Sequence, residues 1–133
     1  MSTAEELVFA RCTTHAGLSA LIGLRCYPDR IPEDPTYPLV RFTRIGTPTF
    51  GLRHMAPGNT PSARVRIQFD AYGETGNDAR AVAEQLFAAW DGYQSSGWGS
   101  DVGYAFQDNR IAMRDDALNT YRQIVDVIML VST

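Results

Sequence analysis

The chain has 133 residues, enough for one domain with a hydrophobic core and too few for two ordinary domains. Its hydrophobic share of 44% and charged share of 20% are typical of a globular protein, and no apolar run approaches the length that spans a bilayer. All positive side chains are arginine and the net charge is −3, which argues against a general nucleic-acid binder. We therefore expect a single domain over residues 1–133 that crosses no membrane.

The chain begins with signals for a helix. Ser2 and Thr3 each precede a glutamate by three residues, a capping-box pattern that predicts a helix over residues 4–14. Gly17 is expected to break this helix, and residues 18–23 are predicted to form a short second turn. This start lacks the basic segment and apolar core of a secretory signal, so we expect the protein to stay in the cytosol where it is made.

Strands are predicted where apolar and polar residues alternate. Residues 63–72 alternate strictly, which indicates a strand with one core face and one polar face. Shorter strands are expected at 25–28, where a proline ends the segment, and at 39–46. A hairpin over 102–114 and 120–131 closes the chain, and its first strand is interrupted at Gln107, Asp108 and Asn109 by a bulge or a turn.

The main helix is predicted over residues 75–92, where apolar residues follow the i, i+3, i+4, i+7 rule. A proline- and glycine-rich connection at 47–62 precedes the strand at 63–72, and a Ser/Gly link at 94–100 follows the helix. Together these elements predict an α+β fold. It has a mainly antiparallel sheet of four to five strands, with two helices packed on one face.

From Ile124 to Val131 the last strand is apolar on both faces, with Asp126 as the one charged exception. An antiparallel sheet in a lone domain normally has one face in water, so a partner protein is expected to cover the second face. Asp126 should then find an arginine or backbone donors there. The alternative is that this strand is central and the connection 47–62 folds over it.

Three arginines, Arg41, Arg64 and Arg66, are expected on the polar face of two adjacent strands. One interpretation is a solvated face balanced by Asp70 and by acids from a neighbour, and the other is contact with phosphate. Because the planar guanidinium pairs well with carboxylates, we treat these arginines as candidates for a protein interface before a DNA contact.

Residues suited to catalysis or metal binding are few. His15 is expected at the C-terminal end of the first helix and His54 in the connection 47–62, and neither has a second ligand at metal-binding spacing. Cys12 and Cys26 are expected to be reduced thiols. Cys12 and His15 share a helix face, which leaves open a small enzyme or ligand-binding domain, but we expect no catalytic residue, metal or cofactor.

The order of these segments resembles the tail-completion or tail-terminator proteins of long-tailed bacteriophages, prophages and gene-transfer particles. The resemblance covers nearly the whole chain and is carried by residues 20–23 (ALIG), 25–32 (RCYPDRIP), 37–40 (YPLV), 63–72 (ARVRIQFDAY), 90–93 (WDGY) and 121–127 (YRQIVDV). The connection 47–62 and the link 94–100 depart from the family pattern.

The resemblance implies a structural virion protein without catalytic residues. It would form a ring, usually a homohexamer, that caps the head-proximal end of the tail tube, ends tube polymerisation and joins the tail to the head neck. Its partners would be copies of itself, the major tail tube protein and a head-completion or neck protein, and DNA would pass through without specific binding. The protein would lie in the neck region of the virion after assembly in the host cytoplasm. Another head-tail connector or neck adaptor is the alternative.

A ring closes when each subunit offers one surface to a different surface of the next, so protruding loops and sheet edges are the natural contacts. We therefore expect four residues of the connection to reach a neighbouring subunit or the tube, namely Phe50, Arg53, His54 and Met55.

Overall fold

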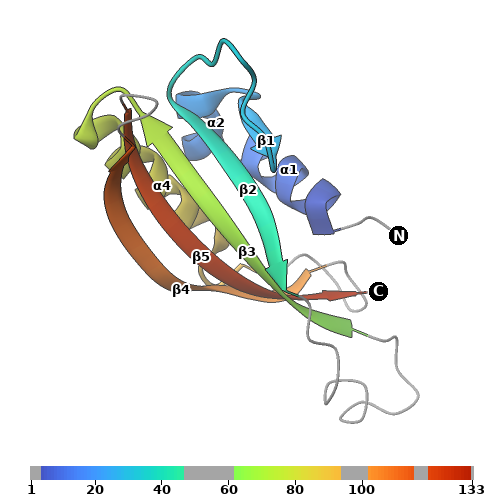
Figure 1. Ribbon diagram of the computed structural model, residues 1–133. Coiled ribbons are helices and arrows are strands. Elements are labelled where there is room, and N and C mark those ends of the chain that lie inside the picture. Colours follow the sequence, from blue (N-terminus) through green and yellow to red (C-terminus); the bar gives the residue numbers. More distant parts are fainter. Residues whose placement is uncertain (1–3, 47–61, 94–101, 116–119, 133) are drawn as a thin grey trace.

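A computed structural model describes residues 4–46, 62–93, 102–115 and 120–132, with elements labelled as in Figure 1. Its helices are α1 (Ala4–Thr14), α2 (Ala16–Ile22) and α4 (Gly76–Trp90). Its strands are β1 (Cys26–Pro28), β2 (Leu39–Gly46), β3 (Ser62–Gly73), β4 (Val102–Asp115) and β5 (Thr120–Ser132). None of the described helices is long and apolar enough to cross a membrane.

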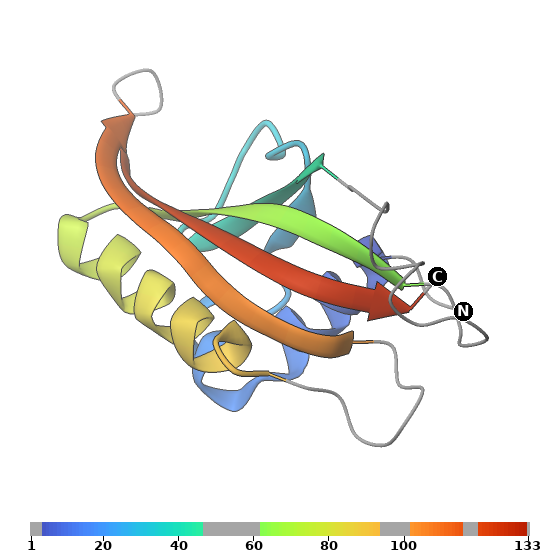
Figure 2. The same cartoon turned by 90° about the horizontal axis from the view of Figure 1, so that it is seen from below.

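The five strands form one sheet in the order β1-β2-β3-β5-β4. β1 runs parallel to β2, and every other pair is antiparallel. The described helices all cover the same face of this sheet, here called the inner face, and the outer face carries none of them (Figure 2). The predicted α+β class and mainly antiparallel sheet are confirmed, with α2 as a helix beyond the two expected.

The boundary between the first two helices differs from the prediction. His15, expected at the end of the first helix, is the N-cap of α2: its backbone is extended and its Nδ1 accepts a hydrogen bond from the Leu18 N–H at 3.3 Å. Gly17 lies inside α2 and does not break a helix. A Cβ at Gly17 would meet the end of the Gln85 side chain on α4, which would have to shift.

The hydrophobic core lies between the inner face and the helices. Alternate residues of β3 and β5 are fully buried there, and Phe69 packs on Trp90 of α4 with ring centroids 5.9 Å apart. The apolar stripe of α4 faces this core as its spacing predicts, with one correction. Phe87, counted with the stripe, is 47% exposed because it falls at the edge of the buried arc.

The C-terminal hairpin is confirmed, and the interruption in its first strand is a bulge. The register between β4 and β5 shifts between Gln107 and Asn109, and again between Val102 and Tyr104. Apart from these two shifts, β4 is paired with β5 as far as Asp115. A bulge adds one residue to a strand without ending it, so the polar residues here do not form a turn.

Candidate assembly surface

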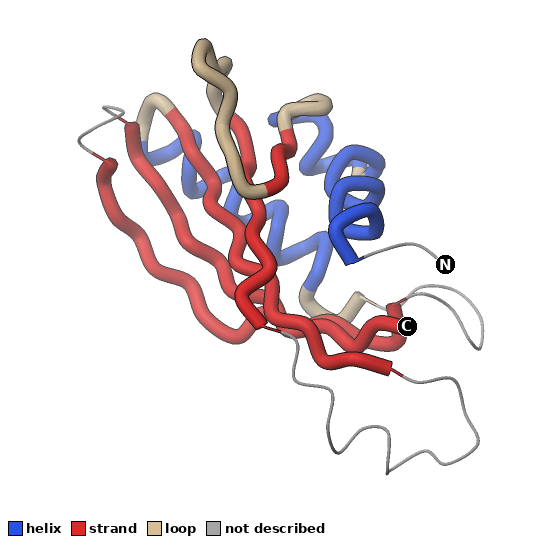
Figure 3. The backbone as a smooth tube through the Cα atoms, turned by 45° about the vertical axis from the view of Figure 1, so that its right-hand side comes forward, coloured by secondary structure: helices blue, strands red, loops and turns tan. Residues whose placement is uncertain are grey.

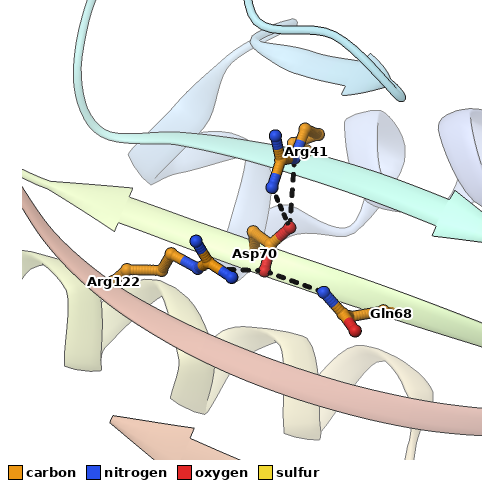
Figure 4. Close-up of polar contacts among 4 residues, drawn as sticks. All are labelled: Arg41, Gln68, Asp70 and Arg122. Carbon is orange, nitrogen blue, oxygen red and sulfur yellow. Dashed lines mark hydrogen bonds and ion pairs between the residues drawn. The ribbon is translucent and has the colours of Figure 1, made fainter. Parts of the chain in front are cut away.

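The centre of the outer face is an ionic cluster around Asp70, whose side chain is fully buried (Figure 4). Arg41 donates two hydrogen bonds to Asp70 Oδ2, from Nη2 at 2.7 Å and from Nε at 3.1 Å. Arg122 Nε lies 3.3 Å from Asp70 Oδ1, and Gln68 donates to the same oxygen at 3.3 Å. A buried carboxylate requires such partners because desolvation of an unpaired charge is costly.

Sheet register explains why these residues meet. Arg41 of β2 is the direct cross-strand partner of Asp70 of β3. Arg122 of β5 is the cross-strand partner of Tyr72, two residues further along β3. Both guanidinium carbons lie 5.8 Å from the centroid of the Tyr72 ring, which is itself 1% exposed. The cluster therefore covers this part of the outer face from within the chain, and the predicted balance of Arg41 by Asp70 is confirmed.

Arg66 holds a second group of acids on the same face. Its Nη1 lies 2.9 Å from Asp108 Oδ2 and 3.4 Å from Asp126 Oδ2. Asp126 thus has the arginine that its sequence context predicted, but the arginine comes from its own chain. The other carboxylate oxygen of Asp126 is buried without a hydrogen-bond partner among the described residues.

The remaining predicted interface residues are not placed by the structure. Arg64 belongs to the backbone of β3, but its side chain is not among those described. The four loop residues Phe50, Arg53, His54 and Met55 lie outside the described residues. Their role in subunit or tube contacts stays a prediction.

The second apolar face is partly covered by the chain itself. Ile128 on the outer face of β5 is 3% exposed, between its cross-strand partners Arg66 and Phe106. Half-exposed apolar side chains occur on β4, where Ile111 is 47% exposed and Met113 is 48% exposed. The sequence prediction assigned this strand as irregular and so missed them, although their i, i+2 spacing places both on one face.

An apolar groove lies near the other edge of the sheet. In this region α1 runs beside β1 (Figure 3). It measures about 280 Å³ and is lined by Glu5, Glu6, Phe9, Pro28 and Phe42. No sequence signal marks it, because its walls come from a helix and two strands that meet only in the fold.

The thiol and imidazole groups have structural roles. Cys12 and Cys26 are buried free thiols, and the hydrogen bond between them, together with burial, raises the pKa of Cys26 strongly. The pKa of His15 is lowered, first by burial and then by Arg11. Cys12 is buried in the core, and His15 Nδ1 accepts the capping hydrogen bond of α2. Within the described ranges, no three His, Cys, Asp or Glu side chains are grouped to hold a metal ion.

The comparison with known families decides the identity. Residues 6–132 match the family model described as "Tail completion protein gp17". The chain belongs to this family. The resemblance seen in the sequence is therefore confirmed, and the tail-completion protein is a structural tail protein of phage-type virions.

A solved structure agrees on the fold. The tail-completion protein is similar to a chain in "Virion of native gene transfer agent (GTA) particle", with a TM-score of 0.68 and 15% sequence identity. The match covers 95% of this chain and 92% of that chain, so the likeness concerns the whole fold. None of the curated proteins matches the sequence.

Proposed function

We propose that this tail-completion protein forms a six-fold ring that caps the head-proximal end of the tail tube, ends tube polymerisation and joins the tail to the neck. The observation that carries the proposal is the family match over residues 6–132. The fold shared with a chain of a gene transfer agent virion supports it, because that chain also comes from an assembled particle. The partners are copies of the same chain, the tube protein and a head-completion or neck protein, and no catalysis is involved.

The surface of the chain suits assembly into a ring. A ring needs two different surfaces on each copy, because the contact is made head to tail. The half-exposed apolar residues of β4 and the groove beside α1 are two such surfaces, and they lie on different elements of the fold.

The charges suit a ring through which DNA passes. The net charge is −3, and two of the outer-face arginines, Arg41 and Arg66, are engaged by carboxylates of their own chain. Retaining a nucleic acid requires basic side chains that neutralise its phosphates. Paired arginines lower the affinity for DNA and let it move through.

The test is tube growth in the presence of the protein. Tube protein is polymerised with and without the tail-completion protein, and tube length and end structure are followed by negative-stain electron microscopy. The proposal expects growth to stop and one end of each tube to carry a ring. Light scattering of the protein alone and with tubes gives its mass. A protein that remains a monomer with tubes, while the tubes grow as before, would reject the proposal.

A further inference from the structure

The two cysteines of the chain lie next to each other at one edge of the sheet. Cys12 belongs to α1 and Cys26 to the edge strand β1, which lies beside α1 (Figure 1). Both side chains are buried in the same hydrophobic cluster, at 0% and 1% exposure. Their thiols share a hydrogen bond, so the two sulfurs are in contact.

Contact between two thiols is the arrangement from which a disulfide forms. The bond joins sulfurs about 2 Å apart, so thiols that already touch need only a small movement to reach it. The edge strand can make this movement without breaking the rest of the sheet, because β1 is paired only with β2.

The helix α1 is held on the sheet by few buried side chains, which gives an oxidant access to the pair. Of its described residues, only Val8 and Cys12 are buried. Arg11 adds a hydrogen bond to the Ala89 carbonyl at 3.2 Å and lies 4.0 Å from the centroid of the Tyr93 ring. Elements with few buried contacts open locally while the rest stays folded, so α1 exposes the thiols transiently.

The same burial keeps the pair reduced inside a cell. The hydrogen bond with Cys12, together with burial, raises the pKa of Cys26, and thiols react through the thiolate. Oxidation is therefore slow, and the reductants of the cytosol hold such thiols in the reduced form. A virion that has left its host meets dissolved oxygen without these reductants.

We infer that Cys12 and Cys26 form a disulfide in the released virion and thereby fasten α1 to β1. Each thiol gives up its proton and one electron: two S–H bonds break, one S–S bond forms, and dissolved O2 takes both hydrogens and becomes H2O2. The bond closes the segment that contains α2, which restricts the unfolded chain more than the folded one. This inference uses the virion location of the family and is independent of the ring proposed above.

Peptide mapping tests for the bond directly. Trypsin cleaves after Arg11 and Arg25, so it places the two cysteines in separate peptides, 12–25 and 26–30. Free thiols are blocked with N-ethylmaleimide in denaturant, in host-cell lysate and in particles released into aerated medium, and both samples are digested without reductant. We expect two blocked cysteines in the lysate and a linked pair of peptides in the particles. The same state in both samples, whether blocked or linked, would overturn the inference.

Thermal unfolding of the purified protein measures the consequence of the bond. Diamide, which takes two hydrogens from a pair of thiols, serves as a fast oxidant in place of oxygen. A disulfide that closes a short segment should raise the Tm by about 5–15 °C, and dithiothreitol should reverse the rise. Cys12→Ala and Cys26→Ala are the matched controls, and diamide should leave the Tm of both unchanged.

Two results in the unmodified protein would contradict the fastening of α1. One is two free thiols after treatment with diamide, and the other is a disulfide that brings no gain in Tm. If a variant does not fold, reversal by dithiothreitol in the unmodified protein remains as the control. Tube capping by the reduced protein is measured separately, so the proposed function stands or falls whatever the state of the thiols.

Discussion

The two faces of the sheet are built from the same strands, but one is stabilised by apolar packing and the other by paired charges. On the inner face, Phe69 and its alternate neighbours are fully buried under the helices. On the outer face, the residue next to it, Asp70, is equally buried but surrounded by arginines. The inner face supplies hydrophobic stabilisation in proportion to the apolar area it buries. The outer face is held by paired charges, whose net contribution is small although the loss of one partner is costly.

The largest effect is expected on the inner face. Phe69→Ala should lower the free energy of unfolding by about 3–5 kcal/mol, since it leaves a cavity against Trp90. Urea unfolding measures this loss. Phe87→Ala, on the exposed side of α4, is the control and should stay within about 1 kcal/mol of the unmodified protein. Equal losses for the two variants would contradict the assignment of the inner face as the core.

A smaller effect is expected at the centre of the outer face. Asp70→Asn keeps the shape but removes the carboxylate that Arg41 and Arg122 share, and should cost about 1–3 kcal/mol. The two arginine side chains are 26% and 22% exposed, so water solvates part of the charge left behind. Urea unfolding at neutral pH tests this. An unchanged stability would show that the cluster does not need its anion.

A still smaller loss of stability is expected at the N-cap of α2, which lies on neither face of the sheet. His15→Ala should cost about 0.5–1 kcal/mol, because α2 loses the acceptor for the Leu18 N–H. The pKa of His15 is lower in the folded chain than its ordinary value of 6.5. Its contribution is therefore complete above pH 6.5 and is lost as the pH falls through the folded pKa.

The pH dependence can be isolated with His15→Asn, which keeps a cap acceptor without a titrating ring. Between about pH 7.5 and about pH 5, this variant should lose less unfolding free energy than the unmodified protein. A larger loss in the variant would show that the sign of the His15 contribution is wrong.

The smallest effect is expected at the rim of the outer face. Asp108→Asn removes the exposed partner of Arg66. Because Arg66 still has Asp126 at 3.4 Å, the free energy of unfolding should fall by only a few tenths of a kcal/mol. Added salt should make even this difference vanish, because exposed pairs are screened. A loss as large as that of Asp70→Asn would remove the distinction between the buried and exposed pairs.

Local patterns in the sequence predicted most of the fold. The alternation in residues 63–72 identified β3 and its buried face, and the capping boxes placed α1 at the observed bounds. The parallel pairing of β1 was not predictable, because three residues carry no periodicity. The N-cap role of His15 was missed, since histidine is not among the preferred caps.

Contacts in the candidate surface were predictable from the sequence only where the apolar–polar alternation shows which residues of adjacent strands share a face. Arg41 and Asp70 lie on polar faces of adjacent strands, so their pairing could be expected. Arg122 joins them only because β5 pairs with β3, which is a long-range choice. The groove between α1, β1 and β2 depends on how a helix packs on a sheet edge, and no local pattern in Phe9 or Pro28 encodes that.

The central claim is that this protein ends the tail tube at its head-proximal side. Cryo-electron microscopy of complete particles tests it most directly, with the chain fitted into the density of the neck. The account predicts one ring of this fold in contact with the last layer of tube protein on the head side. Density for this chain that touches the portal but not the tube would contradict it.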